Sequence, residues 1–357
     1  MAHPTRLVVV FGGRSAEHEI SCISARHVMS ALDPERYQVI PVGITRDGRW
    51  VDARRLILDA GPATAALPSP DLASAGDVLP AVGLPEVIGE EGRTVVVPLV
   101  HGPMGEDGTV QGLLELAQLP YVGAGVLASS VCMDKSAAKE ILLFHGVPQC
   151  RWRSARIDEV IPAFLDEAEA VLGYPIFVKP ANLGSSIGIS HVSDREALEV
   201  AVGVAAQYDD FLVLEEAVAG REVEVALLGN DDPEASLPGE VVSEDGFYDY
   251  EEKYVSDRAK LLIPAPLSDT EVATVQGIAI RAFRALRVEG MARVDFFYDA
   301  QRRFLVNEVN TIPGFTPISM YPKLWEASGV PTAELLDRLV ALALERHERR
   351  RAHRFVR

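Results

Sequence analysis

The chain has 357 residues, which is too long for one ordinary compact core and predicts two or three domains. Hydrophobic residues make up 48% and charged residues 24%, a balance that excludes a disordered or fibrous protein. The formal net charge of -18 argues against nucleic acid as a partner, because binding a phosphate backbone needs a clustered basic surface.

The start of the chain lacks the pattern of a signal peptide or a membrane anchor. The apolar run at residues 7–11 is far shorter than a signal-peptide core or a membrane span. We therefore expect a cytoplasmic protein that has no membrane partner. Cys22, Cys132 and Cys150 are widely scattered without a CxxC pair, which predicts reduced, structural thiols.

The first third of the chain alternates short apolar runs with helical patterns. Residues 7–11 and 37–44 read as strands, and residues 15–32 between them read as a helix. Residues 93–100 read as a further strand, so the pattern predicts a parallel sheet. The glycine-rich loop HGPMGEDG at residues 101–108 follows that strand, where open α/β sheets place their ligands.

Two further units follow a helix predicted at residues 134–145. The first has a small α+β pattern, with strands at 174–178, 189–192 and 211–215 and a helix at 194–208. The second has strands at 222–228, 291–297 and 304–310, helices at 269–286 and 332–349, and a tyrosine-rich loop at 246–260. The chain therefore divides into an α/β part and two α+β parts.

A constellation of polar side chains marks two of these strands. Arg293 and Asp295 are two apart on one strand, and Glu308 and Asn310 are two apart on the next, so each pair shares a face. Asp295, Glu308 and Asn310 supply the oxygen ligands that nucleotide-bound magnesium takes from proteins. Arg293 would donate to a transferring phosphoryl group or an oxyanion. The alternative is the polar outer face of an ordinary sheet.

A second signal is the segment KPANLGSSIG, residues 179–188. A lysine at a strand end followed by a Gly-Ser-Ser turn offers a cation, backbone N–H groups and hydroxyls to a pair of phosphates. An ordinary hairpin turn is the alternative reading. The loop YDYEEKY, residues 248–254, is either a lid over a reacting centre or an ordinary exposed loop.

Seven ordered segments across nearly the whole chain resemble the D-alanine:D-alanine ligase family. They are FGG followed by SAEHEIS, then VHGPMGEDGTVQG, DKSAAKEIL, FVKPANLGSSIGIS, YDYEEKY, MARVDFF and VNEVNTIPGFTPISMYP. The resemblance implies an ATP-grasp fold with an N-terminal parallel-sheet, Rossmann-like domain. It divides the chain into a substrate-binding domain at 1–125, a central ATP-grasp subdomain at 126–214, and a C-terminal ATP-grasp subdomain with the metal and acceptor site at 215–357.

The same resemblance implies an ADP-forming carbon–nitrogen ligase that makes D-alanyl-D-alanine for peptidoglycan through an acyl phosphate. Its small-molecule substrates would be D-alanine and ATP, with two Mg²⁺ or Mn²⁺ ions, and the family suggests a homodimer. The alternatives are a D-alanine:D-lactate or D-alanine:D-serine ligase, or another ATP-grasp carboxylate–amine ligase. A rival from another class is a nucleotide-binding regulatory protein that has lost turnover.

Site residues carried over by position fall into an ATP group and a substrate group. The ATP group comprises Lys135, Lys179, Ser186, Glu215, Val218, Glu222 and Lys253. The substrate and catalytic group comprises Glu17, His101, Ser185, Tyr254, Arg293, Ser319 and Met320. The family often has a lysine after the position of Glu215, whereas this chain has Glu216. Relatives that use D-lactate lack the tyrosine that stands here at 254, which favours an amine acceptor.

Overall fold

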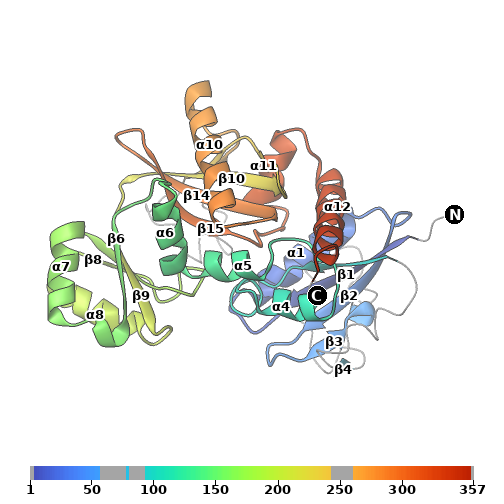
Figure 1. Ribbon diagram of the computed structural model, residues 1–357, viewed down its shortest axis with the longest axis horizontal. Helices are drawn as coiled ribbons and strands as arrows, with labels where there is room; N and C mark the ends of the chain where they lie inside the picture. Colours follow the sequence, from blue (N-terminus) through green and yellow to red (C-terminus); the bar gives the residue numbers. More distant parts are fainter. Residues whose placement is uncertain (1–3, 57–77, 80–92, 243–259, 355–357) are drawn as a thin grey trace.

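Three β-sheets organise the chain (Figure 1). The structure is a computed structural model that describes residues 4–56, 78–79, 93–242 and 260–354. A five-stranded sheet near the N-terminus and a four-stranded sheet lie at opposite ends of the molecule, and a six-stranded sheet lies between them. The site described below forms where these units meet.

The five-stranded sheet has the order β4-β3-β2-β1-β5 and a parallel centre. Its strands are β1 (Thr5–Gly12), β2 (Tyr37–Ile44), β3 (Trp50–Asp52), β4 (Val78–Leu79) and β5 (Thr94–Pro98). Residues 7–11 are fully buried, as expected for a parallel strand covered on both faces. The predicted parallel arrangement is confirmed, and β3 and β4 add an antiparallel edge that the sequence did not indicate.

Two helices cover the faces of this sheet. Helix α1 (His18–Ala31) packs on one face and α4 (Thr109–Leu116) on the other. Because β1 and β5 are parallel neighbours, the loops that follow them leave from the same edge. The hydroxyl of Ser15 donates to the carbonyl of His101 at 2.7 Å, which joins the two loops.

The four-stranded sheet is antiparallel and has the order β6-β9-β7-β8. Its strands are β6 (Trp152–Arg156), β7 (Ile176–Pro180), β8 (Ser190–Val192) and β9 (Phe211–Glu216). Its core includes apolar residues of the helices α7 (Pro162–Leu172) and α8 (Arg195–Ala205), and a short 3-10 turn spans Ile157–Glu159. The pairing of β7 with β8 confirms the two strands predicted on either side of the glycine-rich turn, whereas β6 and α7 were not predicted.

The six-stranded sheet is antiparallel, with β14 between β10 and β15. Its strands are β10 (Gly220–Gly229), β11 (Glu234–Ala235), β12 (Gly239–Val242), β13 (Lys260–Leu262), β14 (Gly290–Asp299) and β15 (Phe304–Asn310). Helix α10 (Asp269–Ala285) covers the apolar face. It begins with a capping box in which the N–H of Ser268 donates to Glu271 at 2.8 Å.

Two short helices connect the first sheet to the four-stranded sheet. They are α5 (Val126–Met133) and α6 (Lys135–Phe144), and Asp134 caps α6 by accepting from the N–H of Ala137 at 2.9 Å. Both helices contribute apolar residues to the core of the six-stranded sheet. The division at residues 125 and 214 stays a prediction.

The last two helices are α11 (Met320–Ala327) and α12 (Thr332–Arg351). Helix α12 adds its leucines to the core that also contains Leu7 and Val97 of the first sheet. The buried Arg346 donates to the carbonyl of Tyr121 at 2.7 Å and to that of Gly123. Neither α12 nor any other helix in the described ranges is long and apolar enough to cross a membrane.

Candidate active site

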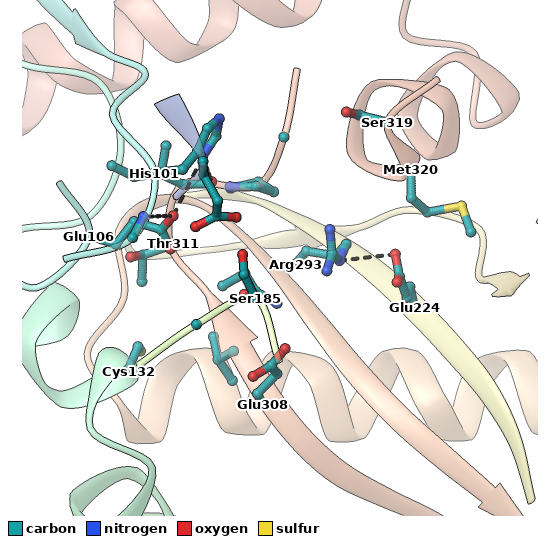
Figure 2. Close-up of a pocket in the computed structure, with 18 of the residues that line it drawn as sticks. His101, Glu106, Cys132, Ser185, Glu224, Arg293, Glu308, Thr311, Ser319 and Met320 are labelled. Atoms are coloured by element: carbon teal, nitrogen blue, oxygen red, sulfur yellow. Dashed lines mark hydrogen bonds and ion pairs between the residues drawn. The ribbon is translucent and has the colours of Figure 1, made fainter. Parts of the chain in front are cut away.

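A cavity of about 370 Å³ lies where the three units meet. Glu17 and His101 reach it from the loops of the first sheet, and Ser185 reaches it from the turn between β7 and β8. Arg293 and Glu308 line it from β14 and β15 (Figure 2). The cavity therefore collects side chains from all three sheets.

The strand pair β14–β15 brings the predicted polar residues together. Arg293 pairs with Asn310 and Asp295 pairs with Glu308, so all four side chains share one face. The opposite face is apolar and buried, as at Val294. The guanidinium of Arg293 binds both carboxylate oxygens of Asp295 at 2.7 Å, and Asn310 Nδ2 donates to Asp295 at 2.8 Å.

The neighbouring strand β10 adds a carboxylate that sequence reasoning missed. Glu224 pairs with Asp295 across the strands, is 6% exposed, and lies 2.9 Å from Arg293 Nε through its Oε2 (Figure 2). It stands two residues after Glu222, so strand periodicity could have placed both on one face. Two carboxylates therefore hold Arg293 in place.

The oxygen ligands proposed for magnesium fit that ion chemically. In the part of the chain that the structure describes, no group of three or more His, Cys, Asp or Glu side chains is arranged around a metal position. A nucleotide-bound magnesium ion needs only a few protein oxygens, because phosphates and water complete its octahedron. Asp295 and Glu308 offer carboxylates on adjacent strands, and Asn310 donates with its nitrogen, which leaves its amide oxygen for the ion.

The Gly-Ser turn presents a buried hydroxyl to the cavity. Ser185 and Ser186 have φ angles of 55° and 57°, a left-handed conformation that favours glycine and is held here by two serines. The Oγ atom of Ser185 is buried and has no hydrogen-bond partner within the described residues. Burying a hydroxyl without a partner costs roughly 1–3 kcal/mol, which a ligand in the cavity would recover.

Lys135 connects this turn with the strand pair. Its Nζ donates to the carbonyl of Leu183 at 2.6 Å and lies 3.8 Å from Glu308 Oε2. Its backbone N–H donates to the carbonyl of Ala181 at 2.9 Å. The proposed phosphate-binding and metal-binding side chains are therefore in contact across the cavity.

A buried ionic cluster stands behind the turn. Lys179 Nζ lies 2.7 Å from Glu215 Oε2, and Lys139 Nζ lies 3.1 Å from Glu215 Oε1. Burial alone would raise the pKa of the Glu215 carboxyl, but the two ammonium groups outweigh it and lower that pKa to about 2. Lys139 was not among the predicted site residues, although it lies one helical turn after Lys135.

Replacing Glu215 by glutamine should lower the free energy of unfolding by about 3–5 kcal/mol at pH 7, because two buried ammonium groups lose their counter-charge. The folded pKa of Glu215 lies below its ordinary value of 4.5. Its contribution is therefore complete above about pH 4.5 and is lost as the pH falls towards 2. Urea unfolding of both proteins at several pH values measures this difference.

The matched control is Glu216→Gln. Glu216 binds the exposed Arg151 at 2.6 Å, and an exposed pair contributes roughly 0–1 kcal/mol. A difference between wild type and Glu215→Gln that stays constant below pH 4.5 would contradict the assigned ionisation.

His101 is buried and held by hydrogen bonds from two directions. Its Nδ1 donates to the carbonyl of Ile312 at 3.1 Å and lies 3.5 Å from Glu106 Oε1, while its Nε2 lies 3.4 Å from the hydroxyl of Ser24. Burial lowers the pKa of the imidazole, but Glu106 and Glu17 together raise it above the ordinary value. Glu106 lies in the predicted HGPMGEDG loop and was not singled out.

Glu17 lies between the first sheet and the Gly-Ser turn. It precedes helix α1 without capping it through its side chain, and it is 9% exposed. A Cβ atom added at Gly102 would lie 3.0 Å from its Oε2, and one added at Gly184 would lie 3.9 Å away. The Glu17 carboxylate is therefore close enough to the turn for one small ligand to contact both.

The start of helix α11 forms another wall of the cavity. Ser319 accepts a hydrogen bond from the N–H of Thr316 at 2.9 Å, and Met320 is the first helical residue (Figure 2). Free N–H groups at a helix start attract carboxylates, which suits the predicted acceptor role of this segment. Lys323, one turn further along, also lines the cavity and was missed from the sequence.

The structure describes only some of the remaining predicted residues. Val218 lies in the connection between β9 and β10, and Glu222 lies on β10 on the same face as Glu224. Lys253 and Tyr254 fall outside the described residues. Roles for all these side chains stay predictions.

Comparisons with known proteins identify the family. Residues 6–124 match the family model of the D-ala D-ala ligase N-terminus, and residues 142–341 match that of the D-ala D-ala ligase C-terminus. The chain belongs to the D-alanine–D-alanine ligase family. A D-alanine–D-alanine ligase of Geobacillus thermodenitrificans is 47% identical over 356 residues, covering 96% of each chain. One of Solibacter usitatus is 44% identical over 353 residues, covering 99% of each.

Solved structures of D-alanine–D-alanine ligases and related enzymes share the fold. The ligase from Coxiella burnetii has a TM-score of 0.79 and 37% identity, covering 98% of this chain and 97% of its own. The VanG D-Ala:D-Ser ligase of Enterococcus faecalis has a TM-score of 0.81 and 34% identity, covering 96% and 100%. The predicted ATP-grasp fold with mixed α/β and α+β parts is confirmed.

Proposed function

We propose that this protein joins two D-alanine molecules into D-alanyl-D-alanine for peptidoglycan precursors, with conversion of ATP to ADP and phosphate. The observation that carries the proposal is the convergence of Arg293, Glu308 and Ser185, whose buried hydroxyl has no partner among the described residues, on one cavity in a member of this ligase family. The reaction needs cations and hydrogen-bond donors close to carboxylates. This cavity holds all three kinds of group.

In the first step, the carboxylate of one D-alanine attacks the γ-phosphorus of ATP. The new C–O–P bond gives an acyl phosphate, and ADP leaves with the electron pair of the broken P–O bond. Glu17 would hold the ammonium of this D-alanine, and Lys135 and Lys179 would offset charge on the phosphates. Asp295, Glu308 and Asn310 would hold magnesium or manganese, which neutralises phosphoryl charge when bound.

In the second step, the amine of the other D-alanine attacks the acyl carbon. Its carboxylate would bind Ser319 and the N–H of Met320, and Arg293 would stabilise the tetrahedral oxyanion. Collapse of that species expels phosphate and leaves the amide bond. The amine must lose a proton, because an α-amino group has a pKa of roughly 8. The acceptor is either the network of Ser185, Tyr254 and Glu17 or the departing phosphate.

Phosphate release should depend on D-alanine and proceed poorly with L-alanine. In a coupled assay, D-alanine is compared with D-lactate and D-serine as the second substrate, each in the presence of D-alanine as the first. We expect D-alanine to be preferred, since Tyr254 stands where D-lactate-using relatives lack a tyrosine. Faster turnover with D-serine would instead assign the specificity of the VanG relative.

A chain that binds ATP without releasing phosphate under any of these conditions would be a regulatory relative.

The cellular location and the oligomeric state of this protein are further parts of the proposal. The use of ATP as a substrate favours the cytoplasm, and the family suggests a homodimer. Size-exclusion chromatography with light scattering measures the second point.

A further inference from the structure

We propose that Lys139 is a positioning residue for ATP, because it neutralises Glu215 from behind and thereby frees Lys179 to donate to the nucleotide phosphates. The inference rests on the proposed function for the identity of the nucleotide. It assigns a role to a lysine that does not line the cavity and that sequence reasoning passed over.

The geometry places Glu215 between two lysines. Its two carboxylate oxygens are divided between them, with Lys139 Nζ at 3.1 Å and Lys179 Nζ at 2.7 Å. The side chains of Glu215 and Lys139 are 3% and 2% exposed, while that of Lys179 is 10% exposed. Only Lys179 therefore retains some access to solvent from within the cluster.

The contacts of Lys139 show that it acts through Glu215. Its ammonium lies against Glu215 and 3.6 Å from the thiol of Cys150, whose pKa burial raises to about 11. At neutral pH the thiol is uncharged, so Glu215 is the counter-charge of Lys139 among the described residues. Burial opposes the charged form of Lys139, but Glu215 outweighs it and raises the pKa of the amine.

The net charge of the cluster depends on Lys139. With Lys139 present, the cluster has two positive charges and one negative charge, so a net positive charge remains beside the turn. Without Lys139, Glu215 and Lys179 would form a neutral pair, and Lys179 would have to leave its one ion-pair partner among the described residues to bind a phosphate. Removal of a buried partner is costly, so this exchange would weaken nucleotide binding.

The scarcity of lysine in the chain supports the same interpretation. The chain has 34 Lys and Arg residues, of which only six are lysines, leaving 28 arginines. Three of these six, Lys135, Lys139 and Lys179, stand at or behind the proposed phosphate site. A compact ammonium fits a buried position between a carboxylate and a thiol, whereas the planar guanidinium of arginine needs more room and more acceptors.

The test is a thermodynamic cycle on nucleotide binding. Binding of ATP with magnesium is measured by calorimetry for wild type, Lys139→Met, Glu215→Gln and the double variant. We expect Lys139→Met to raise the Kd roughly tenfold in the wild-type background. In the Glu215→Gln background, where there is no carboxylate to neutralise, the same change should raise the Kd less than about threefold.

An equal effect of Lys139→Met in both backgrounds, or no effect in wild type, would overturn the proposal. Lys260→Met is the matched control, because Lys260 is an exposed lysine on β13, and its Kd should stay unchanged. Lys139→Gln removes the same charge while keeping a hydrogen-bond donor. Failure of both Lys139 variants to fold, judged by circular dichroism, would assign Lys139 a purely structural role.

The same experiments separate this inference from the proposed function. Wild-type protein that binds ATP but releases no phosphate with D-alanine would refute the ligase activity and leave the cycle measurable. Wild-type protein that is fully active, combined with a Lys139→Met variant of unchanged Kd, would refute the inference alone.

Discussion

Replacing Asp295 by asparagine should lower ADP formation by about a thousandfold, an increase of roughly 4 kcal/mol in the activation barrier. The change removes one of the two carboxylates proposed for magnesium and keeps the shape of the side chain. Arg293 would still be held by Glu224 at 2.9 Å, so we expect the fold to be retained. Coupled ADP release measures turnover, and circular dichroism measures folding.

Asp299→Asn is the matched control on the same strand. Asp299 is another carboxylate of β14, but its partner is Arg303, at 2.7 Å, and it is not among the proposed metal ligands. We expect this variant to keep its turnover. An Asp295→Asn protein with wild-type turnover would rule out the metal role.

Replacing Arg293 by lysine should lower kcat by roughly 100- to 1000-fold, the loss typical of one oxyanion donor. Arginine spans both oxygens of Asp295 and also contacts Glu224, and a single ammonium cannot keep this geometry. The KM for the second D-alanine should rise as well, because the proposed acceptor carboxylate and the oxyanion share this cation. Steady-state kinetics with D-alanine varied over a wide range separates the two KM values.

Arg303→Lys provides the control for the loss of an arginine. Arg303 is an exposed partner of Asp299, so the same substitution there should leave kcat and both KM values unchanged. Equal activity of Arg293→Lys and wild type would assign Arg293 to the structure of the sheet alone.

The face shared by Arg293, Asp295, Glu308 and Asn310 was predictable because strand periodicity is local. Alternation of polar and apolar residues over two strands fixes which side chains share a face. The pairing of β14 with β15 in the register Asp295–Glu308 then follows from burying Val294 and Val309 together. The parallel centre of the first sheet was predictable from a different local pattern, since its strands are continuous apolar runs that suit burial on both faces.

Other parts of the site depend on tertiary contacts that leave no local pattern. Lys139 looks like an ordinary surface lysine of an amphipathic helix, and only its packing against β9 shows that it is buried beside Glu215. Strand β6 begins at Trp152 with the polar sequence WRSAR, which lacks strict alternation, so its pairing with β9 was not indicated. Glu224 was missed because its partner, Arg293, comes from a strand nearly seventy residues later.

Helix α12 covers the N-terminal sheet only late in the synthesis of the chain. Strand β5 ends at residue 98, but the helix that completes the apolar core beside it begins only at residue 332. At translation rates of about 5–20 residues per second, roughly 10–50 s separate the synthesis of these two elements. During that interval the nascent N-terminal sheet exposes one apolar wall to solvent or to a chaperone, and that wall is covered only once α12 has been synthesised.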